Sequence, residues 1–303
     1  MVLFSCGESA SSLEEQGNDA LEQNDFAAAI EFYTQALELD SELDKSFFNR
    51  GRCHFALSDF DNAMSDFDQS LELNANNQPL HFNKALCLME LKQYAEALTS
   101  FDKVDSIGEN KADLLLQKAN CHFKLGAYAN AINFYDQAQP FFEDSISINL
   151  LRGTSSFQLG KFTDALVDLE YYLTFDPDHP LALEYTALAS FGSGNFENTV
   201  ANFEVSIENG VVLVGDNLSI YIDALVFTAL ESKAEDDYET ALGLLTKANE
   251  LDPNNKDGFL HRGLLFLEMG TREAACEDLN TAFTNGQLKA LDFMKYSCPT
   301  YFE

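Results

Sequence analysis

The sequence predicts an all-α protein of about eight helix-turn-helix repeats, followed by a short C-terminal capping helix. The first observation is a period of 34 residues. Small residues recur at this spacing at Gly17, Gly51, Ala85, Ala119, Gly153 and Ala187, and after one break at Ala229 and Gly263. The second is an aromatic residue nine positions after seven of these eight small residues. The third is that apolar residues around them follow helical spacing, which is typical of amphipathic helices.

The composition agrees with a folded helical chain. Hydrophobic residues make up 46% of the 303 residues and Phe alone occurs 26 times, so the chain can bury enough apolar surface to exclude intrinsic disorder. Lys and Arg number 18 against 50 Asp and Glu, which gives a formal charge of −32. Phosphate backbones and anionic lipid headgroups repel such a chain, so we expect no nucleic-acid binding and no membrane contact by the repeats.

The repeats follow one another in order along the chain. We place them at 10–43, 44–77, 78–111, 112–145, 146–179, 180–213, 222–255 and 256–289. Residues 10–213 thus form an array of six repeats and residues 222–289 form two more, with an insertion at 214–221 between them. Residues 1–9 are a tether or the remnant of a signal, and residues 290–303 are the capping helix and tail.

The turn between the two helices of a repeat is marked by residue type. Some turns carry residues that tolerate the left-handed backbone conformation: Asn24, Gly126, Gly160, Gly194 and Gly270. The position after the turn offers side chains able to cap the second helix: Asp25, Asp59, Asn195, Asp237 and Thr271. Each repeat therefore has local signals that end one helix and begin the next.

Two places depart from the 34-residue period. The insertion at 214–221 allows two interpretations: a tolerated loop with a lengthened first helix in the seventh repeat, or a hinge between the two arrays. The tail after Gly286 keeps apolar residues at helical spacing. We expect it to form a helix over the last repeat, because the end of a repeat stack needs a cap.

In the best-kept repeat, Gly153 is followed by Phe162, Ala165 and Leu169. This order of a small residue, an aromatic, Ala and a bulky apolar residue, at a 34-residue period, resembles the tetratricopeptide repeat family. The resemblance covers residues 10–289. It implies a right-handed α-solenoid whose first helices line a concave groove, and a scaffold for protein–protein interaction.

The groove positions of that family can be carried over to this chain. The candidate peptide-binding residues are Phe48, Arg52, Phe55, Phe82, Met89, Leu116, Asn120, Phe123, Leu150, Phe157 and Phe191. Since most are apolar and the chain is acidic, we expect a protein or peptide partner with apolar anchors flanked by basic residues. The alternative is a structural subunit whose repeats stack on another subunit or on themselves. Deep burial of Phe55, Phe123 and Phe157 would favour that alternative.

Some members of the family grip the C-terminal carboxylate of a partner with two Asn and several basic side chains. Asn18 and Asn49 match this pattern, but Glu14 stands at the first basic position, and Pro79 and Asn83 stand at the last two. Because Glu14 would repel a carboxylate, we do not expect this activity.

Residues able to support catalysis or to bind a metal are present but scattered. Cys53, Cys87 and Cys121 share one position in three repeats, which suits a small buried thiol between helices. The five His residues lack metal-binding spacing, and the loop from Asp252 lacks the ligands of a calcium loop. No phosphate-binding loop, dinucleotide turn or nucleophile elbow occurs. We therefore expect no enzyme, no catalytic residue, no metal and no cofactor.

A ladder of basic residues precedes the small residue of five repeats. Its members are Arg50, Lys84, Lys118, Arg152 and Arg262. One interpretation packs their stems between helices and places their charges against neighbouring carboxylates. The other leaves a positive seam for an acidic ligand.

The first residues bear on location. Leu3-Phe4-Ser5-Cys6-Gly7 resembles a bacterial lipoprotein cleavage box, in which Cys6 would carry the lipid. Only five residues precede Cys6, so either the resemblance is accidental or the true start lies upstream. The motif favours the bacterial cell envelope over the cytoplasm. The five other cysteines, taken as unpaired, argue for a reducing compartment instead.

Overall fold

The computed structural model describes residues 8–104, 111–142 and 146–299. Those residues form α-helices, one short 3-10 helix and connecting turns, and they contain no strand. The all-α prediction is confirmed. None of the helices in this part of the chain is both long and apolar enough to cross a membrane.

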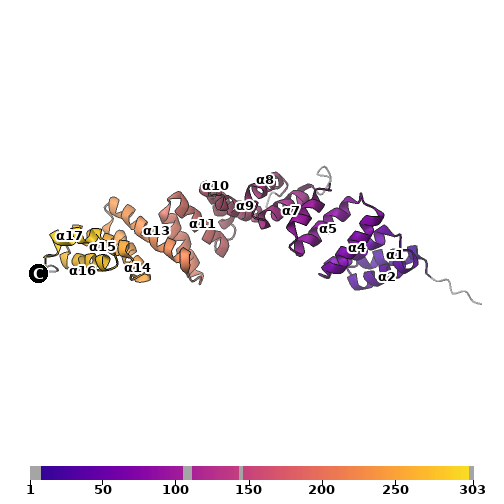
Figure 1. The fold of residues 1–303 in the computed structure, drawn as a ribbon, viewed down its shortest axis with the longest axis horizontal. Helices are drawn as coiled ribbons and strands as arrows, with labels where there is room; N and C mark the ends of the chain where they lie inside the picture. Colours follow the sequence, from indigo (N-terminus) through magenta and orange to yellow (C-terminus); the bar gives the residue numbers. More distant parts are fainter. Residues whose placement is uncertain (1–7, 105–110, 143–145, 300–303) are drawn as a thin grey trace, which may run out of the picture. The chain divides into compact units, whose positions relative to one another are not determined.

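The chain divides into two compact units, 1–144 and 145–303, and each is described by itself. The first unit holds four helix pairs (Figure 1): α1 (Ala10–Glu22) with α2 (Phe26–Leu39), α3 (Asp44–Ala56) with α4 (Phe60–Leu73), α5 (Gln78–Glu90) with α6 (Tyr94–Phe101), and α7 (Lys111–Lys124) with α8 (Tyr128–Ala138). The 3-10 helix η1 (Gln139–Phe141) follows α8.

The second unit holds four further pairs and a final helix (Figure 1). They are α9 (Ile146–Gln158) with α10 (Phe162–Leu173), α11 (Pro180–Ser193) with α12 (Phe196–Glu208), α13 (Gly215–Ala234) with α14 (Tyr238–Leu251), α15 (Lys256–Glu268) with α16 (Arg272–Thr284), and α17 (Lys289–Ser297). Each predicted repeat therefore holds one helix pair. At 20 residues, α13 takes up nearly all of the predicted insertion, which matches the interpretation of a lengthened first helix.

The turns within the repeats have the predicted backbone conformation. Asn24 and the four predicted turn glycines all have φ between 57° and 82°. Ser58, Lys92 and Asp236 adopt the same conformation without being glycine or asparagine, so residue type alone did not predict it there. Two to three residues must reverse the chain at every turn, so the left-handed conformation is imposed there whatever the residue.

Most of the predicted caps are formed. Asp25, Asp59, Asn195 and Asp237 each accept a backbone N–H from the residue three positions later, at 3.1 to 3.4 Å. Thr271 stands at the N-cap of α16 but forms no such bond. Its hydroxyl instead donates to the carbonyl of Phe266.

The small residues of the period lie where the two helices of a repeat meet. A Cβ atom on Gly17 would come within 2.6 Å of the Tyr33 ring, and one on Gly51 within 2.7 Å of the Phe67 ring. Tyr33 and Phe67 are fully buried, as is Ala119. The small residue thus leaves room for a large side chain from the second helix, and this contact forms the core of the repeat.

The predicted capping helix is present as α17. Its residues Ala290 and Met294 are buried against Leu279 and Ala282 of the last repeat. A disulfide joins Cys276 to Cys298 and ties the end of α17 to α16. The view that these cysteines are unpaired is therefore wrong, because the return of the tail along α16 brings two residues 22 positions apart to a Cα–Cα distance of 5.6 Å.

Candidate functional site

The candidate binding surface of the first unit is a hollow formed mainly by residues of α1, α3 and α5. It has a volume of about 730 Å³ and is lined by Asn18, Leu21, Glu22, Asn24, Phe26, Asn49, Arg52, Phe55, Ala56 and Asn83. Two of the candidate peptide-binding residues, Arg52 and Phe55, are among them. Three successive first helices each contribute a carboxamide, so the hollow is more polar than the predicted apolar groove.

A chain of hydrogen bonds orders one wall of this hollow. The hydroxyl of buried Tyr33 donates to Oδ1 of Asn18 at 2.7 Å, and Nδ2 of Asn49 donates to the same oxygen at 3.0 Å. Arg52 donates to Oδ1 of Asn49 at 3.3 Å. Burial is the main cause that raises the pKa of Tyr33, so its hydroxyl keeps the proton that it donates.

The other aromatic candidates of the first unit are half-buried and contact the second helix of their own repeat. The ring pairs are Phe48–Phe67, Phe55–Phe60, Phe82–Phe101 and Phe123–Tyr128, with centroids 5.5 to 6.2 Å apart. Met89 and Leu116 are half-buried as well, whereas Arg52 is exposed and its guanidinium lies 5.7 Å from the Phe48 ring centroid. Each of these side chains thus packs partly against its own repeat and is partly exposed to solvent.

Asn120 repeats the arrangement of Asn18. Its Oδ1 accepts a hydrogen bond from the hydroxyl of Tyr135 at 2.8 Å, over the same separation of 15 residues. Tyr135 is fully buried, and a buried hydroxyl without a partner is costly. Asn120 therefore satisfies a buried hydroxyl within its repeat, in addition to being a candidate peptide-binding residue.

The candidates of the second unit, Leu150, Phe157 and Phe191, lie on α9 and α11 and are half-buried. Phe157 contacts Tyr185 of the next repeat, with ring centroids 5.1 Å apart. Phe191 lies 6.4 Å from Phe227 of α13. The predicted groove residues thus form two sets, one in each unit.

Four residues near the candidate sites were not selected from the sequence, although a signal for them exists. Asn49, Asn83, Tyr185 and Phe227 all stand two positions before the small residue of their repeat. That position follows the 34-residue period as closely as those that were selected. Comparing it between repeats would have found a polar set in the first half of the chain and an aromatic set in the second.

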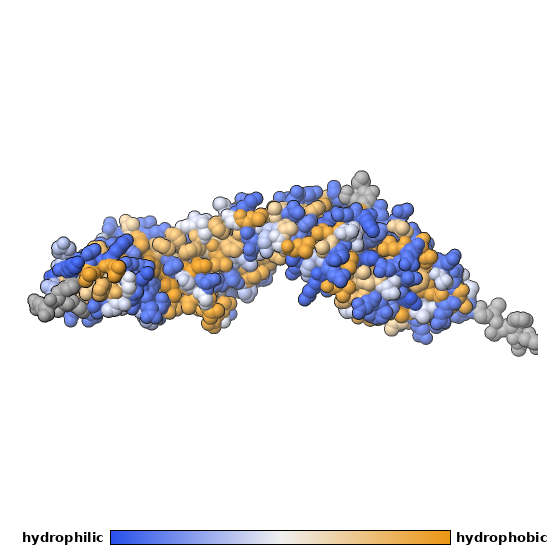
Figure 2. Space-filling model, in the orientation of Figure 1, coloured by the Kyte–Doolittle hydropathy of each residue, from blue (hydrophilic) through white to orange (hydrophobic). Residues whose placement is uncertain are grey.

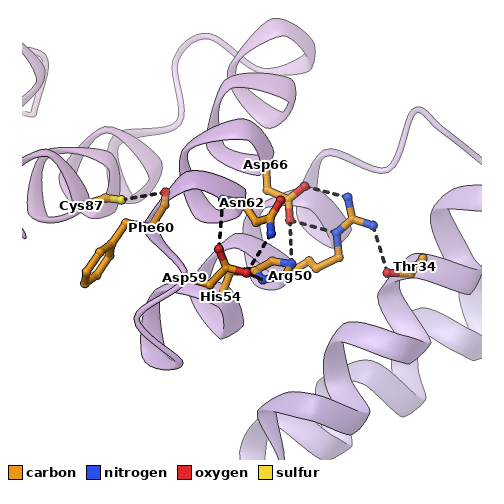
Figure 3. Close-up of polar contacts among 8 residues, drawn as sticks. All are labelled: Thr34, Arg50, His54, Asp59, Phe60, Asn62, Asp66 and Cys87. Carbon is orange, nitrogen blue, oxygen red and sulfur yellow. Dashed lines mark hydrogen bonds and ion pairs between the residues drawn. The ribbon is translucent and has the colours of Figure 1, made fainter. Parts of the chain in front are cut away.

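The basic residues of the ladder are paired with carboxylates, as the first interpretation expects, and Figure 3 shows the pair of Arg50. Arg50 donates from Nε and Nη2 to both carboxylate oxygens of buried Asp66, at 2.9 and 2.7 Å, and from Nη1 to the hydroxyl of Thr34. The other Arg residues of the ladder form the same kind of pair, Arg152–Asp168 and Arg262–Asp278, whereas the Lys residues pair with an Asp of the preceding repeat, as Lys84–Asp68 and Lys118–Asp102. The ladder therefore offers no uncompensated positive seam to a ligand.

The shared cysteine position is buried in all three repeats. Burial is the first cause that raises the pKa of the Cys53 and Cys87 thiols to about 11 and that of Cys121 to about 12. Cys87 donates a hydrogen bond to the carbonyl of Phe60 (Figure 3). These thiols stay protonated at neutral pH and are poor metal ligands and nucleophiles. The lipid-attachment candidate Cys6 lies outside the described residues.

Comparison with known families and structures decides the assignment. A family described as tetratricopeptide repeat matches residues 112–139, and one described as anaphase-promoting complex, cyclosome, subunit 3 matches residues 22–104. The fold is similar to that of a tetratricopeptide repeat protein from Parabacteroides merdae, with a TM-score of 0.53 and 17% identity over 86% of this chain and 100% of the other. The chain is a tetratricopeptide repeat protein.

A second solved structure supports the same fold. It is the C-terminal part of a repeat-containing protein from Cytophaga hutchinsonii, with a TM-score of 0.54 and 16% identity over 80% of this chain and 97% of the other. No curated protein matches by sequence. At these identities, the likeness establishes the fold of this tetratricopeptide repeat protein and leaves its ligand to be argued from its own residues.

The hollow of this tetratricopeptide repeat protein has a mixed charge. Arg52 is its one basic lining residue, and Glu22 lines it as well. A carboxylate in the hollow would therefore meet both a donor and a like charge. Elsewhere in the described part of the chain, no three His, Cys, Asp or Glu side chains gather in a group that could hold a metal ion.

Proposed function

We propose that this tetratricopeptide repeat protein is a scaffold without catalytic activity that binds an extended or helical segment of another protein on the inner side of its first helices. The observation that carries the proposal is the 730 Å³ hollow of the first unit. Its carboxamides can donate to and accept from the main chain of an extended segment. Oδ1 of Asn83 and Nδ2 of Asn18 form no hydrogen bond with the described residues and are available for that purpose.

The partner should carry apolar side chains flanked by Lys or Arg. Half-buried Phe55 lines the hollow and offers an apolar contact, while the formal charge of −32 attracts a basic segment over a longer range. The acidic field should speed the encounter, and the apolar contact should slow dissociation.

The alternative is an assembly subunit whose inner aromatics are core. It calls for deep burial of Phe55, Phe123 and Phe157, but each of these side chains is half-buried. We therefore favour the binding function.

The test is a capture experiment followed by a measured affinity. The immobilised full chain is exposed to an extract of its native cell, and the retained protein is identified and purified. Its Kd is then measured for the wild type, Phe55→Ala and Arg52→Glu, with Val167→Ala as a control on the exposed side of α10. We expect both hollow variants to weaken binding at least tenfold and the control to leave it unchanged. An affinity that is the same for all four folded proteins would contradict the proposed site.

A further inference from the structure

The first helices of the two units differ at two positions of the repeat. These positions stand two residues before and one residue after the small residue. In the first four repeats, seven of the eight residues there are polar, among them Asn18, Asn49 and Asn83. In the last four repeats, six of the eight are apolar, among them Leu188 and Phe227. Both units are built from pairs of helices, so the two units differ at these positions in side-chain chemistry rather than in fold.

The aromatic residues at and beside these positions in the second unit are in contact. Phe227 of α13 stacks on Phe196 with ring centroids 4.6 Å apart and lies 6.4 Å from Phe191 of α11. Phe227 nevertheless keeps 42% of its surface exposed. Figure 2 shows hydrophobic residues gathered over the segment that holds α11 and α13. Apolar surface gathered in this way is typical of a site that a partner covers.

The charges beside this aromatic surface are acidic. Asp223 stands one helical turn before Phe227 on α13, on the same face, and Glu184 stands next to Tyr185 on α11. No ion pair with a described residue neutralises either carboxylate. Lys233, six residues after Phe227 on α13, is already paired with Glu268 at 2.7 Å. The surface therefore complements a basic segment.

A hollow at Asp223 has the dimensions for a long basic side chain. Its volume is about 290 Å³, and Leu218, Ile222, Leu251 and Asp252 are among its lining residues. The exposed lining of this hollow is mostly polar, so it can receive the cationic end of a Lys or Arg, and its Leu and Ile side chains can contact the aliphatic stem. Burial, followed by the nearby Asp257, raises the pKa of Asp223, which is the expected effect of a carboxylate without a counter-charge.

We propose that the surface of Tyr185, Leu188, Phe191 and Phe227, here called the aromatic face, binds an amphipathic segment of another protein, and that Asp223 receives a Lys or Arg of that segment. The proposal rests on the proposed function, since it assigns a second partner surface, of different chemistry, to the same scaffold. A second copy of the chain is a poor occupant, because two molecules with a formal charge of −32 repel each other.

The experiment uses the full chain and a labelled 14-residue amphipathic peptide of Leu and Lys, with a Leu and Glu peptide of the same pattern as its counterpart. Fluorescence anisotropy gives the Kd for the wild type, Phe227→Ala, Asp223→Asn, Val167→Ala and Asp164→Asn. We expect the Lys peptide to bind and the Glu peptide not to bind. Phe227→Ala and Asp223→Asn should each raise the Kd about tenfold, which corresponds to about 1.4 kcal/mol. Val167→Ala and Asp164→Asn, at exposed positions of α10, should each change the Kd less than twofold.

Three results would overturn the proposal: no binding of the Lys peptide, equal losses in Asp164→Asn and Asp223→Asn, or a Kd that Phe227→Ala leaves unchanged. The second result would show unspecific attraction to an acidic protein. Far-ultraviolet circular dichroism confirms that each variant is folded, and Phe227→Ser is a second variant at the same exposed position. These results are separate from the capture experiment, in which Phe55 and Arg52 of the first unit are changed.

Discussion

At the scale of single residues, the basic residue that precedes the small residue of a repeat pairs with an Asp in one of two ways. Where it is Arg, the partner is an Asp 16 residues later in the same repeat, as in Arg50–Asp66 and Arg152–Asp168. Where it is Lys, as in Lys118–Asp102, the partner stands 16 residues earlier, in the preceding repeat. The planar guanidinium grips a buried carboxylate with two donors, whereas the flexible ammonium reaches an exposed one.

This difference predicts unequal costs of removing the carboxylate. Asp168 is buried and accepts two bonds from Arg152 and one from Asn149, so Asp168→Asn should destabilise the protein by about 2–4 kcal/mol, between the values for exposed and buried ion pairs. Asp102→Asn removes an exposed partner and should cost less than about 1 kcal/mol. Urea unfolding of both variants measures the difference. Equal losses in the free energy of unfolding would show that burial of the carboxylate does not determine how much the ion pair stabilises the protein.

A single glycine offers a gain in stability. Gly243 lies inside α14, has an ordinary helical backbone, and has open space where a Cβ would stand. Because glycine in a helix loses more backbone freedom than alanine, Gly243→Ala should stabilise the protein by about 0.5–1 kcal/mol. The matched control is Gly51→Ala, whose Cβ would meet the Phe67 ring at 2.7 Å and should cancel that gain. Thermal unfolding compares the two, and a gain at both positions would contradict the packing argument.

At the scale of elements, the contact between the two helices of a repeat sets the limit on residue size. Ala119 of α7 is fully buried at the same position as Gly51, and Ala119→Leu should cost about 1–3 kcal/mol through overpacking. Stability in a repeat stack is largely a sum of repeat and neighbour terms, so the loss of hydrogen-exchange protection should centre on α7 and α8 and decline toward α1. A uniform loss from α1 to α8 would indicate that the first unit unfolds as one block.

The disulfide of the last helix gives a second prediction at this scale. Cys276 is 7% exposed and Cys298 is 1% exposed, within the cluster that holds α17 on the last repeat. A loop of about this length contributes about 3 kcal/mol through the unfolded state. Reductant, or Cys276→Ser with Cys298→Ser, should therefore speed hydrogen exchange in α17 far more than in α9. As a control, Cys53→Ser removes a free buried thiol outside the disulfide and should leave hydrogen exchange in α17 unchanged.

Thiol counting checks the pairing itself. In the denatured, unreduced protein, Cys276 and Cys298 should resist alkylation, while Cys53, Cys87 and Cys121 should be modified. Alkylation of Cys276 without reductant, in protein prepared under oxidising conditions, would contradict the pairing.

At the scale of the whole molecule, the excess of acidic residues opposes folding. The formal charge of −32 is spread over 303 residues, and self-repulsion is weakened when salt shortens the Debye length from about 30 Å at 0.01 M to about 8 Å at 0.15 M. The midpoint of thermal unfolding should therefore rise as NaCl increases over this range. The measurement is calorimetry at constant pH. A falling midpoint would mean that attractive ion pairs such as Arg50–Asp66 outweigh the repulsion.

The sequence by itself determined the fold class and most of the local signals for turns and helix caps. The 34-residue period arises because the same contact between two helices recurs in each repeat, so it can be recognised in the sequence alone. Gly160 and Asp25 act through their own backbone and their immediate neighbours, which is why a turn and a cap could be predicted from them. Groove candidates such as Phe55 and Phe157 came from the resemblance to the repeat family, and their role stays a prediction.

Only the tertiary structure decided what depends on distant partners. Ser58 and Lys92 take a glycine-like conformation because the packed helices impose the turn. Cys276 and Cys298 form a bond because α17 folds back onto α16. How much of Phe227 stays exposed depends on the aromatic rings around it. Local patterns encode backbone preferences and periodic contacts, whereas pairing and exposure depend on which surfaces the folded helices bring together.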